Sequence, residues 1–356
     1  MDLQSPPPDL YGRPRADRFI QRLTAFSDWY NPLVARRAVP RPTAVQGATA
    51  VQLVVVRHEV VADGVVELRL ASPYGEVLPA WQPGGRVQLI LPSGRKRHYS
   101  LCGDPADRHG YRIAVRRIEG GGGGSVEVHD ELFVGARLAA RPPRNGFAFC
   151  GEGAVLLLAG GIGITPLLPM AYEARRRGLD WQLVHTGRDA ASMPFAAELK
   201  ALDPRRVVLL NDAEHGVPEA AELIAAGPKG AAVYCCGPAP MLAAVRAATP
   251  GDRPLHFERF GAAPITDGHP FTVQLGEEGP MAEVPADRSA LDVLRELRPD
   301  LPYSCHQGFC GTCEVRVKAG TPEHRDRRLT AEDRAAGLLL PCVSRAAEGE
   351  TLVLDL

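Results

Sequence analysis

The stretch "YSCHQGFCGTC", residues 303–313, brings Cys305, Cys310 and Cys313 close together with small residues between them. Their spacing is C-x4-C-x2-C, and Cys342 follows further along the chain. This is the ligand spacing of plant-type [2Fe–2S] centres, in which four thiolates hold the cluster. Glycines in the loop allow the backbone to wrap a cluster closely and to direct N–H groups at its sulfurs. We therefore predict that these four cysteines bind a [2Fe–2S] cluster.

Two other interpretations of the cysteines are a zinc site and a set of unrelated thiols. Zinc sites favour two short C-x2–4-C pairs or pairs of histidines. Here the short spacings share Cys310, so only one such pair can form and no second, separate pair accompanies it. His306 lies inside the loop, but we expect it to face away from the ligands if Cys342 is the fourth. The iron–sulfur interpretation therefore fits the sequence best.

The composition is that of a globular chain with several domains. The 356 residues include 41 basic and 42 acidic side chains, which argues against a nucleic-acid or membrane partner attracted by bulk charge. The longest apolar run, "AVLLLAGGIGITPLLPMA" from Ala154, is interrupted by Gly and Pro, and the N-terminus lacks the apolar core of a secretory signal. We expect a cytoplasmic protein whose eight cysteines are ligands or buried thiols.

The pattern of apolar residues changes along the chain and predicts four parts. Residues 1–48 are an extension rich in Pro and Arg, in which an apolar stripe from Phe19 to Leu33 predicts one amphipathic helix. That stripe fits packing on the protein's own body or docking of a partner. Short alternating strands over 49–151 predict an antiparallel β-barrel. Strand–helix alternation over 152–262 predicts a parallel α/β sheet. A hairpin, a helix and the cysteine loop follow in 263–356.

A flavin site is predicted at the end of one barrel strand, in "RKRHYSLCG". Flavin binding needs a cation for phosphate, an aromatic ring against the isoalloxazine and a small hydroxyl near N5. Arg97, Tyr99 and Ser100 supply these groups, and the backbone of His98 fills the gap between them. A glycine run further along can present N–H groups to a phosphate at a helix start, or can be a plain surface turn. The residues of that run are Gly122, Gly123, Gly124, Ser125 and Val126.

A nicotinamide site is predicted from two glycine-containing turns that follow buried strands. The first, "GGIGITP", supplies Gly161 and Gly163, with Pro166 expected at the first position of a helix. In the second, "CCGPAPML", Cys236 is expected beside the transferring carbon, although adjacent cysteines at a strand end also fit a plain core. Two residues of this turn, Gly237 and Pro238, and two of "HTGRDAASMPF", Thr186 and Arg188, complete the predicted site. Arg188 reads the adenosine ribose or its phosphate, or is a solvated turn residue.

The order of these motifs, followed by "HFERFGA" and the cysteine loop, resembles the phthalate dioxygenase reductase and vanillate demethylase reductase family over roughly residues 50–356. The resemblance implies FMN as the flavin, NADH (or NADPH) as the donor, and a β-grasp ferredoxin domain at the C-terminus. It also implies that Val115 and Arg116 contact FMN, that Thr165 lies near the flavin ring, and that Phe260 covers the ring until nicotinamide displaces it. A monomer that forms transient complexes is expected.

The function expected from these parts is electron transfer. A flavin accepts a hydride from NADH as an electron pair, and an iron–sulfur cluster carries one electron at a time. The expected acceptor is a separate oxygenase of the Rieske type, with a cytochrome P450 as the alternative. Ser100 and Thr165 are expected to hydrogen-bond near flavin N5, and Glu258 is either a proton handler or a surface carboxylate. Two further hypotheses remain: a redox sensor or zinc-stabilised module without turnover, and a stand-alone flavin reductase that uses FAD.

Overall fold

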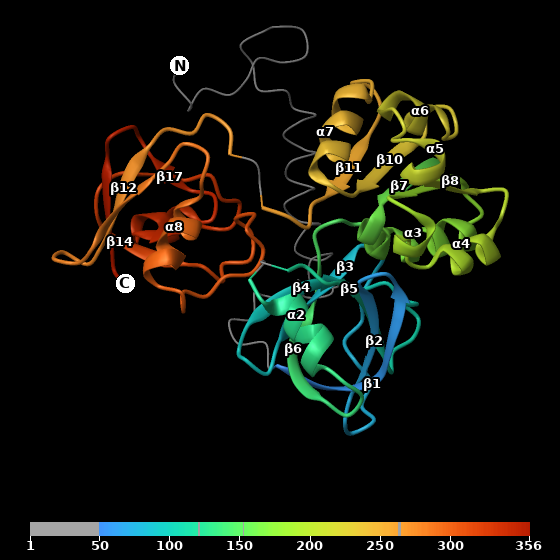
Figure 1. Cartoon of the computed structure of the whole chain (residues 1–356), viewed down its shortest axis with the longest axis horizontal. Helices are drawn as coiled ribbons and strands as arrows, with labels where there is room; N and C mark the ends of the chain where they lie inside the picture. The colour runs from blue at the N-terminus through green and yellow to red at the C-terminus, as the bar shows by residue number, and fades with distance from the viewer. Residues whose placement is uncertain (1–49, 120–121, 152, 263–264) are drawn as a thin grey trace, which may run out of the picture. The chain divides into compact units, whose positions relative to one another are not determined.

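A computed structural model describes residues 50–119, 122–151, 153–262 and 265–356. The predicted N-terminal helix and the residues at 120–121 lie outside this part of the chain. Residues Thr49–Leu356 form one compact unit that contains three separate larger sheets (Figure 1). Among the described residues, each helix is too short or too polar to cross a membrane.

The first sheet is antiparallel and has six strands in the order β4-β3-β6-β1-β2-β5. Its two outer strands, β4 and β5, also contact each other, and the Cys102 N–H next to β4 donates to the Arg112 carbonyl of β5 at 2.9 Å, so the sheet closes into a barrel. Alternate side chains such as Leu68 and Leu70 fill its interior, as the period of two predicts. The strands are β1 (Val51–Ala62), β2 (Val65–Ala71), β3 (Gly85–Ile90), β4 (Lys96–Ser100), β5 (Tyr111–Arg116) and β6 (Arg137–Asn145), with helix α2 (Gly124–Glu131) between the last two.

The second sheet is parallel, with five strands in the order β11-β10-β7-β8-β9. Leu157 of β7 packs into one apolar cluster, whereas Leu156 and Leu158 pack into another, so helices cover both faces of the strand. This explains the unbroken apolar run. The strands are β7 (Ala154–Gly160), β8 (Asp180–Gly187), β9 (Val207–Asn211), β10 (Ala232–Cys236) and β11 (Leu255–Glu258). The helices are α3 (Ile164–Arg176), α4 (Ala196–Leu202), α5 (Asp212–His215), α6 (Ala220–Ala225) and α7 (Ala239–Ala248).

Two details of this sheet differ from the prediction. Strand β11 was not expected, because "LHFE" is short and carries polar residues; it forms because it pairs in parallel with β10, with Glu258 opposite Cys236. Helix α3 begins at Ile164, so Pro166 occupies its third position and not its first. Its missing N–H still costs nothing, because the amides of the first turn have no partner within the helix.

The third sheet contains the cysteine loop and has five strands in the order β13-β12-β18-β14-β16. Strands β12 and β18 pair in parallel and the other pairs are antiparallel. Helix α8 (Ala290–Leu297) is capped by Ser289, whose hydroxyl accepts the Asp292 N–H, and it buries Leu291 and Leu294 against the sheet. The strands are β12 (Phe271–Leu275), β13 (Met281–Val284), β14 (Val315–Ala319), β16 (Leu338–Leu339) and β18 (Thr351–Leu354); two short strands, β15 (Pro322–Glu323) and β17 (Arg345–Ala346), and helix α9 (Ala331–Ala335) lie beside them.

The predicted fold class is confirmed: an antiparallel barrel, a parallel α/β sheet and a C-terminal sheet with one packed helix follow each other along the chain. We refer to them below as the barrel, the α/β part and the C-terminal part. The domain limits at 48/49, 151/152 and 262/263 remain predictions.

Candidate functional site

The four cysteine side chains lie together in the C-terminal part. Cys305 shares side-chain hydrogen bonds with Cys310 and Cys342, and Cys342 shares another with Cys313. The bond to Cys305 and burial raise the pKa of Cys310. Three of the four thiols are buried, with Cys310 half-buried at the surface of the loop. The four sulfurs therefore form one contiguous set, with contacts in the order 310, 305, 342 and 313.

The backbone of the loop is arranged around these sulfurs. The N–H groups of Gln307 and Thr312 donate to the sulfurs of Cys305 and Cys310 at 3.3 and 3.4 Å. Gly308 donates its N–H to Cys342 and has φ of 71°, a conformation that favours glycine. A Cβ at this position would also lie 2.5 Å from the Val343 side chain, so both backbone and packing demand glycine there.

The donor set fits a di-iron cluster better than a single ion. In the described part of the chain, no group of three or more His, Cys, Asp or Glu side chains surrounds a point suited to one metal ion. Four thiols in one contiguous set instead suit a cluster of two irons held by four thiolates. His306 packs edge-on against the ring of Tyr303, with centroids 4.7 Å apart. It therefore has a partner of its own in the loop.

Strand β4 carries the predicted flavin motif. His98 and Ser100 alternate with Arg97 and Tyr99 along the strand, as the pleat requires. Tyr99 packs against the barrel interior, and burial raises the pKa of its phenol. Burial, followed by the charge of Arg86, lowers the pKa of His98 to about 3, so its ring is neutral at physiological pH.

The strand contacts the cysteine loop. His98 Nδ1 lies 2.8 Å from the Ser304 hydroxyl, and its ring packs edge-on against Phe309 with centroids 6.1 Å apart. The Arg97 guanidinium donates to the hydroxyl of Tyr303 at 2.7 Å and to the carbonyl of Gly122 at 2.7 Å. Among the described residues Arg97 forms no ion pair with an acid, so its charge is available to an anion. This observation fits a flavin phosphate.

The glycine run leads directly into helix α2, which begins at Gly124. Gly123 has φ of 74° and places no side chain over the helix start. Ser125 joins the two ends of the glycine-rich loop, because its hydroxyl accepts a hydrogen bond from the Ile118 N–H at 3.1 Å. Val126 is half-buried in the first turn. No side chain that the structure describes caps the N–H groups of the helix start, and the phosphate contact expected there remains a prediction.

The two other residues expected to contact flavin lie at the end of β5. Val115 is buried in the barrel, and its carbonyl lies 2.9 Å from His129 Nε2. Arg116 is exposed and lines a cavity of about 240 Å³ together with residues of the α/β part. The structure thus separates these neighbours, with one side chain in the core and the other at the nucleotide cavity.

The predicted nicotinamide turns meet at the carboxyl ends of β7 and β10. A Cβ on Gly163 would lie 2.1 Å from the Cys236 carbonyl, and one on Gly160 would lie 2.5 Å from Pro238. A Cβ on Gly237 would lie 3.1 Å from Gly160, so these glycines allow the two turns to touch. Gly161 has φ of 53° and lines the 240 Å³ cavity. The cavity lies at the carboxyl ends of parallel strands, which is where dinucleotides bind in sheets of this kind.

The same cavity brings together residues that sequence reasoning assigned and residues that it missed. Thr186 and Arg188 line it as predicted, and Arg188 is exposed. Asp63, from the turn after β1, and Asp212, the first residue of α5, also line it. Neither acid belongs to a recognisable motif, and Asp63 lies far from the others in sequence. Two carboxylates at a nucleotide site would oppose an additional ribose phosphate.

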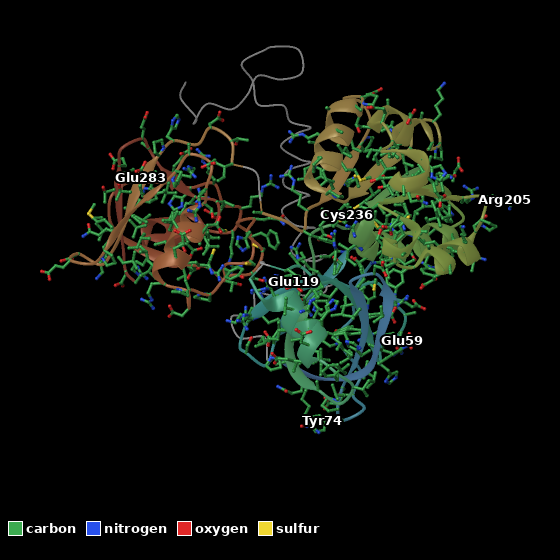
Figure 2. All side chains as sticks on the ribbon, viewed as in Figure 1. Glu59, Tyr74, Glu119, Arg205, Cys236 and Glu283 are labelled. Atoms are coloured by element: carbon green, nitrogen blue, oxygen red, sulfur yellow. The ribbon has the colours of Figure 1, made fainter. Side chains whose placement is uncertain are left out.

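Cys236, labelled in Figure 2, ends β10 and is the register partner of Glu258, which ends β11. Cys236 is fully buried, and burial raises the pKa of its thiol well above the usual value, with a smaller contribution from the charge of Glu258. Burial also raises the pKa of Glu258 to about 7, although Arg86 and Ser100 oppose the shift. Glu258 is only 8% exposed, so its interpretation as a surface carboxylate is wrong.

Glu258 connects the α/β part to the barrel. Ser100 Oγ donates to its carboxylate at 3.4 Å, and Arg86 of β3 forms an ion pair with it at 3.3 Å. Arg86 also lies over the ring of Phe309 in the cysteine loop, 4.0 Å from its centroid. Sequence reasoning missed Arg86, because a single arginine in a barrel strand carries no motif. Arg86 therefore links Glu258 of the α/β part to the barrel and, through Phe309, to the cysteine loop.

The remaining two predicted residues differ in exposure. Thr165 is buried, and its hydroxyl donates to the Ile162 carbonyl at 3.0 Å within the first glycine turn. Phe260, just after β11, is 47% exposed, so its ring is free to lie against a planar ligand. The flavin contacts expected of both residues remain predictions.

Comparison with known proteins agrees with this geometry. Residues 274–347 match the 2Fe-2S iron-sulfur cluster binding domain. The chain is 36% identical to phthalate dioxygenase reductase of Burkholderia cepacia over 316 residues, which cover 86% of this chain and 97% of that protein.

Two solved structures are similar to the described fold. One is phthalate dioxygenase reductase, "a modular structure for electron transfer from pyridine nucleotides to [2Fe-2S]", with a TM-score of 0.63, 35% identity, and coverage of 88% of this chain and 100% of that one. The other is an intact type IV self-sufficient cytochrome P450 monooxygenase, with a TM-score of 0.64, 34% identity, and coverage of 92% of this chain and 44% of that one. From the sequence identity, the coverage and the shared order of parts, it follows that the chain belongs to the phthalate dioxygenase reductase family.

Proposed function

We propose that this chain is the reductase component of an oxygenase system, an oxidoreductase that takes electrons from NADH and delivers them singly to a partner oxygenase. The proposed cofactors are FMN on the barrel and a [2Fe–2S] cluster on Cys305, Cys310, Cys313 and Cys342. When bound, the flavin accepts a hydride and the cluster carries single electrons, so that together they convert a two-electron donor into a one-electron supply. The cytoplasm is the proposed location, where thiols stay reduced.

The observation that carries this proposal is the contact between the cysteine loop and the flavin motif. Ser304, which precedes the ligand Cys305, bonds to His98 at 2.8 Å, and Phe309, which precedes Cys310, packs on His98 and Arg86. The Gln307 side chain donates to the Arg259 carbonyl at 2.7 Å, directly after Glu258. The loop that would hold the cluster thus touches both the strand that would hold the flavin and the segment beside the nicotinamide turn.

The chain's own residues would orient the reactants and handle one proton. Gly163 and Gly237 carry no side chains, which leaves room at the two turns where the nicotinamide would lie. The buried Cys236 would form the bottom of that site. Ser100 would direct its hydroxyl at flavin N5 while it remains in contact with Glu258. Because the pKa of Glu258 is about 7, its carboxyl group would hold or release a proton at physiological pH. No acid or base is required for the hydride step itself.

The acceptor is proposed to be a separate oxygenase of the Rieske type. A cytochrome P450 is the second candidate, and one observation favours it: 92% of this chain matches part of a self-sufficient P450 monooxygenase. The two acceptors differ in their own metal centre and not in what they require of the reductase. Reconstitution with a purified Rieske-type oxygenase and, separately, with a purified cytochrome P450 would decide between them.

An absorption spectrum of the full-length protein tests the proposal. We expect overlapping flavin and iron–sulfur bands, release of FMN on denaturation, and anaerobic bleaching of both bands by NADH at a lower concentration than NADPH. A colourless protein that contains zinc would support a structural module without turnover. Released FAD, together with full flavin reductase activity in a Cys310→Ser variant, would support the stand-alone flavin reductase. Either result would overturn the proposed function.

A further inference from the structure

A cavity of about 760 Å³ lies where β4 and the glycine run approach the C-terminal part. Four cationic side chains line it: Arg95, Lys96 and Arg97 from the barrel, and Arg295 from α8. The acid on its wall, Asp300, is already paired with Arg298 at 2.9 Å. Among the described residues only Arg95 of the four cations has an acidic partner, Glu127 at 3.1 Å. The cavity therefore has an excess of positive charge.

Among the residues that the structure describes, Arg295 lacks a hydrogen-bond partner for one of its buried nitrogen atoms. Its guanidinium lies over the ring of Tyr303, 4.0 Å from the centroid, and the residue is half-buried. Its Nε atom is buried, and no hydrogen-bond partner lies within reach among the described residues. A buried donor without an acceptor destabilises the folded protein. A bound anion with several acceptor oxygens would remove this cost.

Tyr303 connects Arg295 to the glycine run. Its hydroxyl accepts a hydrogen bond from Arg97 Nη2 at 2.7 Å, and the Arg97 guanidinium lies 4.3 Å from the centroid of its ring. A Cβ on Gly122 would lie 1.1 Å from this hydroxyl, so the absence of a side chain in the run admits Tyr303. The phenol thus lies between the two arginines at the mouth of the run, where its hydroxyl can still donate its own proton.

We propose that the flavin phosphate is bound by the barrel and the C-terminal part together, with Arg295 and Tyr303 completing the site begun by Arg97 and the glycine run. The inference rests on the proposed binding of FMN. It assigns a binding role to two residues outside the flavin motif. The phosphate carries close to two negative charges and several acceptor oxygens, which matches uncompensated arginines, a phenol donor and the start of α2.

A consequence concerns the attachment of the C-terminal part. If the phosphate is the shared anion, FMN ties α8 and the cysteine loop to the barrel, whereas riboflavin, which lacks the phosphate, does not. Without an anion, Arg97 and Arg295 repel each other, and burial together with the neighbouring positive charges lowers the pKa of Arg97. The phosphate would convert this repulsion into attraction.

The test is a pair of titrations of the flavin-depleted full-length protein with FMN and with riboflavin, monitored by flavin fluorescence. We expect Arg295→Gln to raise the Kd for FMN about tenfold, as loss of one charge-assisted contact predicts, and to change the Kd for riboflavin less than about twofold. Tyr303→Phe should show the same selectivity with a smaller effect, about threefold. An equal change for both flavins, or no change for either, would overturn the inference.

Matched controls separate this outcome from other causes. Arg288→Gln removes the same charge from the same part of the chain, but Arg288 pairs with Glu296 outside the cavity. Tyr74→Phe removes an exposed phenol that projects from the barrel (Figure 2). Both controls should bind FMN like the wild type. If the wild type itself does not bind FMN, the proposed function fails rather than the assignment of these residues.

A second readout does not depend on affinity. Amide hydrogen exchange in α8 and in residues 303–313 should slow when FMN is added to the full-length protein, and should remain unchanged with riboflavin at the same occupancy. The Arg295→Gln variant should lose most of the FMN-dependent protection. Equal protection by both flavins would show that the isoalloxazine, and not the phosphate, holds the C-terminal part, and would overturn the inference.

Discussion

The two ends of strand β4 contact different parts of the chain and differ in their electrostatics. At one end, Arg97 donates to Tyr303 of the C-terminal part and has no acidic partner among the described residues. At the other end, Ser100 donates to Glu258 of the α/β part, and Arg86 compensates that carboxylate. Only two residues, His98 and Tyr99, separate the uncompensated cationic environment at Arg97 from the compensated, nearly neutral environment at Ser100.

This difference indicates how a single short strand serves two tasks. A binding site for a charged group is left with excess charge of the opposite sign, because the ligand completes the pairing. A site for a reacting ring is kept close to neutral, with one carboxyl group whose pKa lies near physiological pH. On this view the Arg97 end of β4 holds the flavin phosphate, and the Ser100 end supports hydride transfer to the flavin ring. His98, between them, contacts the cysteine loop through which electrons would leave.

The largest expected effect comes from a variant that blocks electron transfer out of the flavin and leaves hydride transfer to the flavin intact. Cys310→Ser deletes one of four ligands, so we expect the iron–sulfur absorption to vanish and reduction of a one-electron acceptor such as cytochrome c to fall on the order of 100-fold. Bleaching of the flavin by NADH in an anaerobic stopped-flow experiment should continue at the wild-type rate. Cys150→Ser, which replaces an exposed cysteine outside the cluster, is the control. Parallel loss of flavin bleaching would contradict the division of tasks.

The second way is to weaken hydride entry alone. Ser100→Ala removes the hydroxyl expected near flavin N5, together with its bond to Glu258. Loss of a hydrogen bond to a charged group costs about 2 kcal/mol, which corresponds to a roughly 30-fold slower bleaching of the flavin by NADH. The Kd for FMN should stay within about twofold of the wild type, because the phosphate end is intact. A variant that loses FMN without slower bleaching would place Ser100 in binding rather than in hydride entry.

Features that appear as short motifs could be predicted from the sequence. The cysteine spacing and the glycine-rich turns at 160–163 and 237 are recognisable because each motif lies within a few neighbouring residues. The strands and most helices followed from their apolar periods in the same way. The cysteine spacing in residues 303–313 is therefore sufficient to predict an iron–sulfur part at the C-terminus.

Features set by long-range contacts could not be predicted. Glu258 becomes buried only because β11 pairs with β10 and Arg86 arrives from a strand 172 residues away in sequence. Arg97 and Tyr303 lie 206 residues apart, and Asp63 reaches the nucleotide cavity from the barrel. These partners have no motif, because their role arises from geometry and charge at the meeting of separate elements.

The third prediction tests whether the carboxyl group of Glu258, at the Ser100 end of β4, has a raised pKa. Burial raises the pKa of Glu258 from 4.5 to about 7, so between these values the folded protein retains a proton that the unfolded chain has released. This contribution to stability is full below pH 4.5 and is lost as the pH rises through 7, with a steepest slope of about 1.4 kcal/mol per pH unit. Glu258→Gln should remove that slope from the free energy of unfolding.

Denaturant unfolding of the full-length protein at several pH values between 5 and 8 would measure the slope. Glu283→Gln replaces an exposed carboxylate of the C-terminal part and should leave the slope unchanged (Figure 2). If Glu258→Gln unfolds with the wild-type pH dependence, the carboxyl group titrates near its ordinary value, and the compensated end of β4 is not neutral at physiological pH.

The smallest expected effect concerns the preference for NADH over NADPH at the nucleotide cavity of the α/β part. Asp212 and Arg188 line the same cavity, and a ribose phosphate there would be repelled by Asp212 and attracted by Arg188. Because both side chains are at least partly exposed, solvent screens each interaction to at most about 1 kcal/mol. Asp212→Asn should therefore raise kcat/KM for NADPH about fivefold and leave that for NADH within about twofold. Arg188→Gln should shift the ratio in the opposite direction, since it removes the attraction. If both variants keep the wild-type ratio, the adenosine end lies away from these residues, and charge selects the ligand only at the anchoring end of β4.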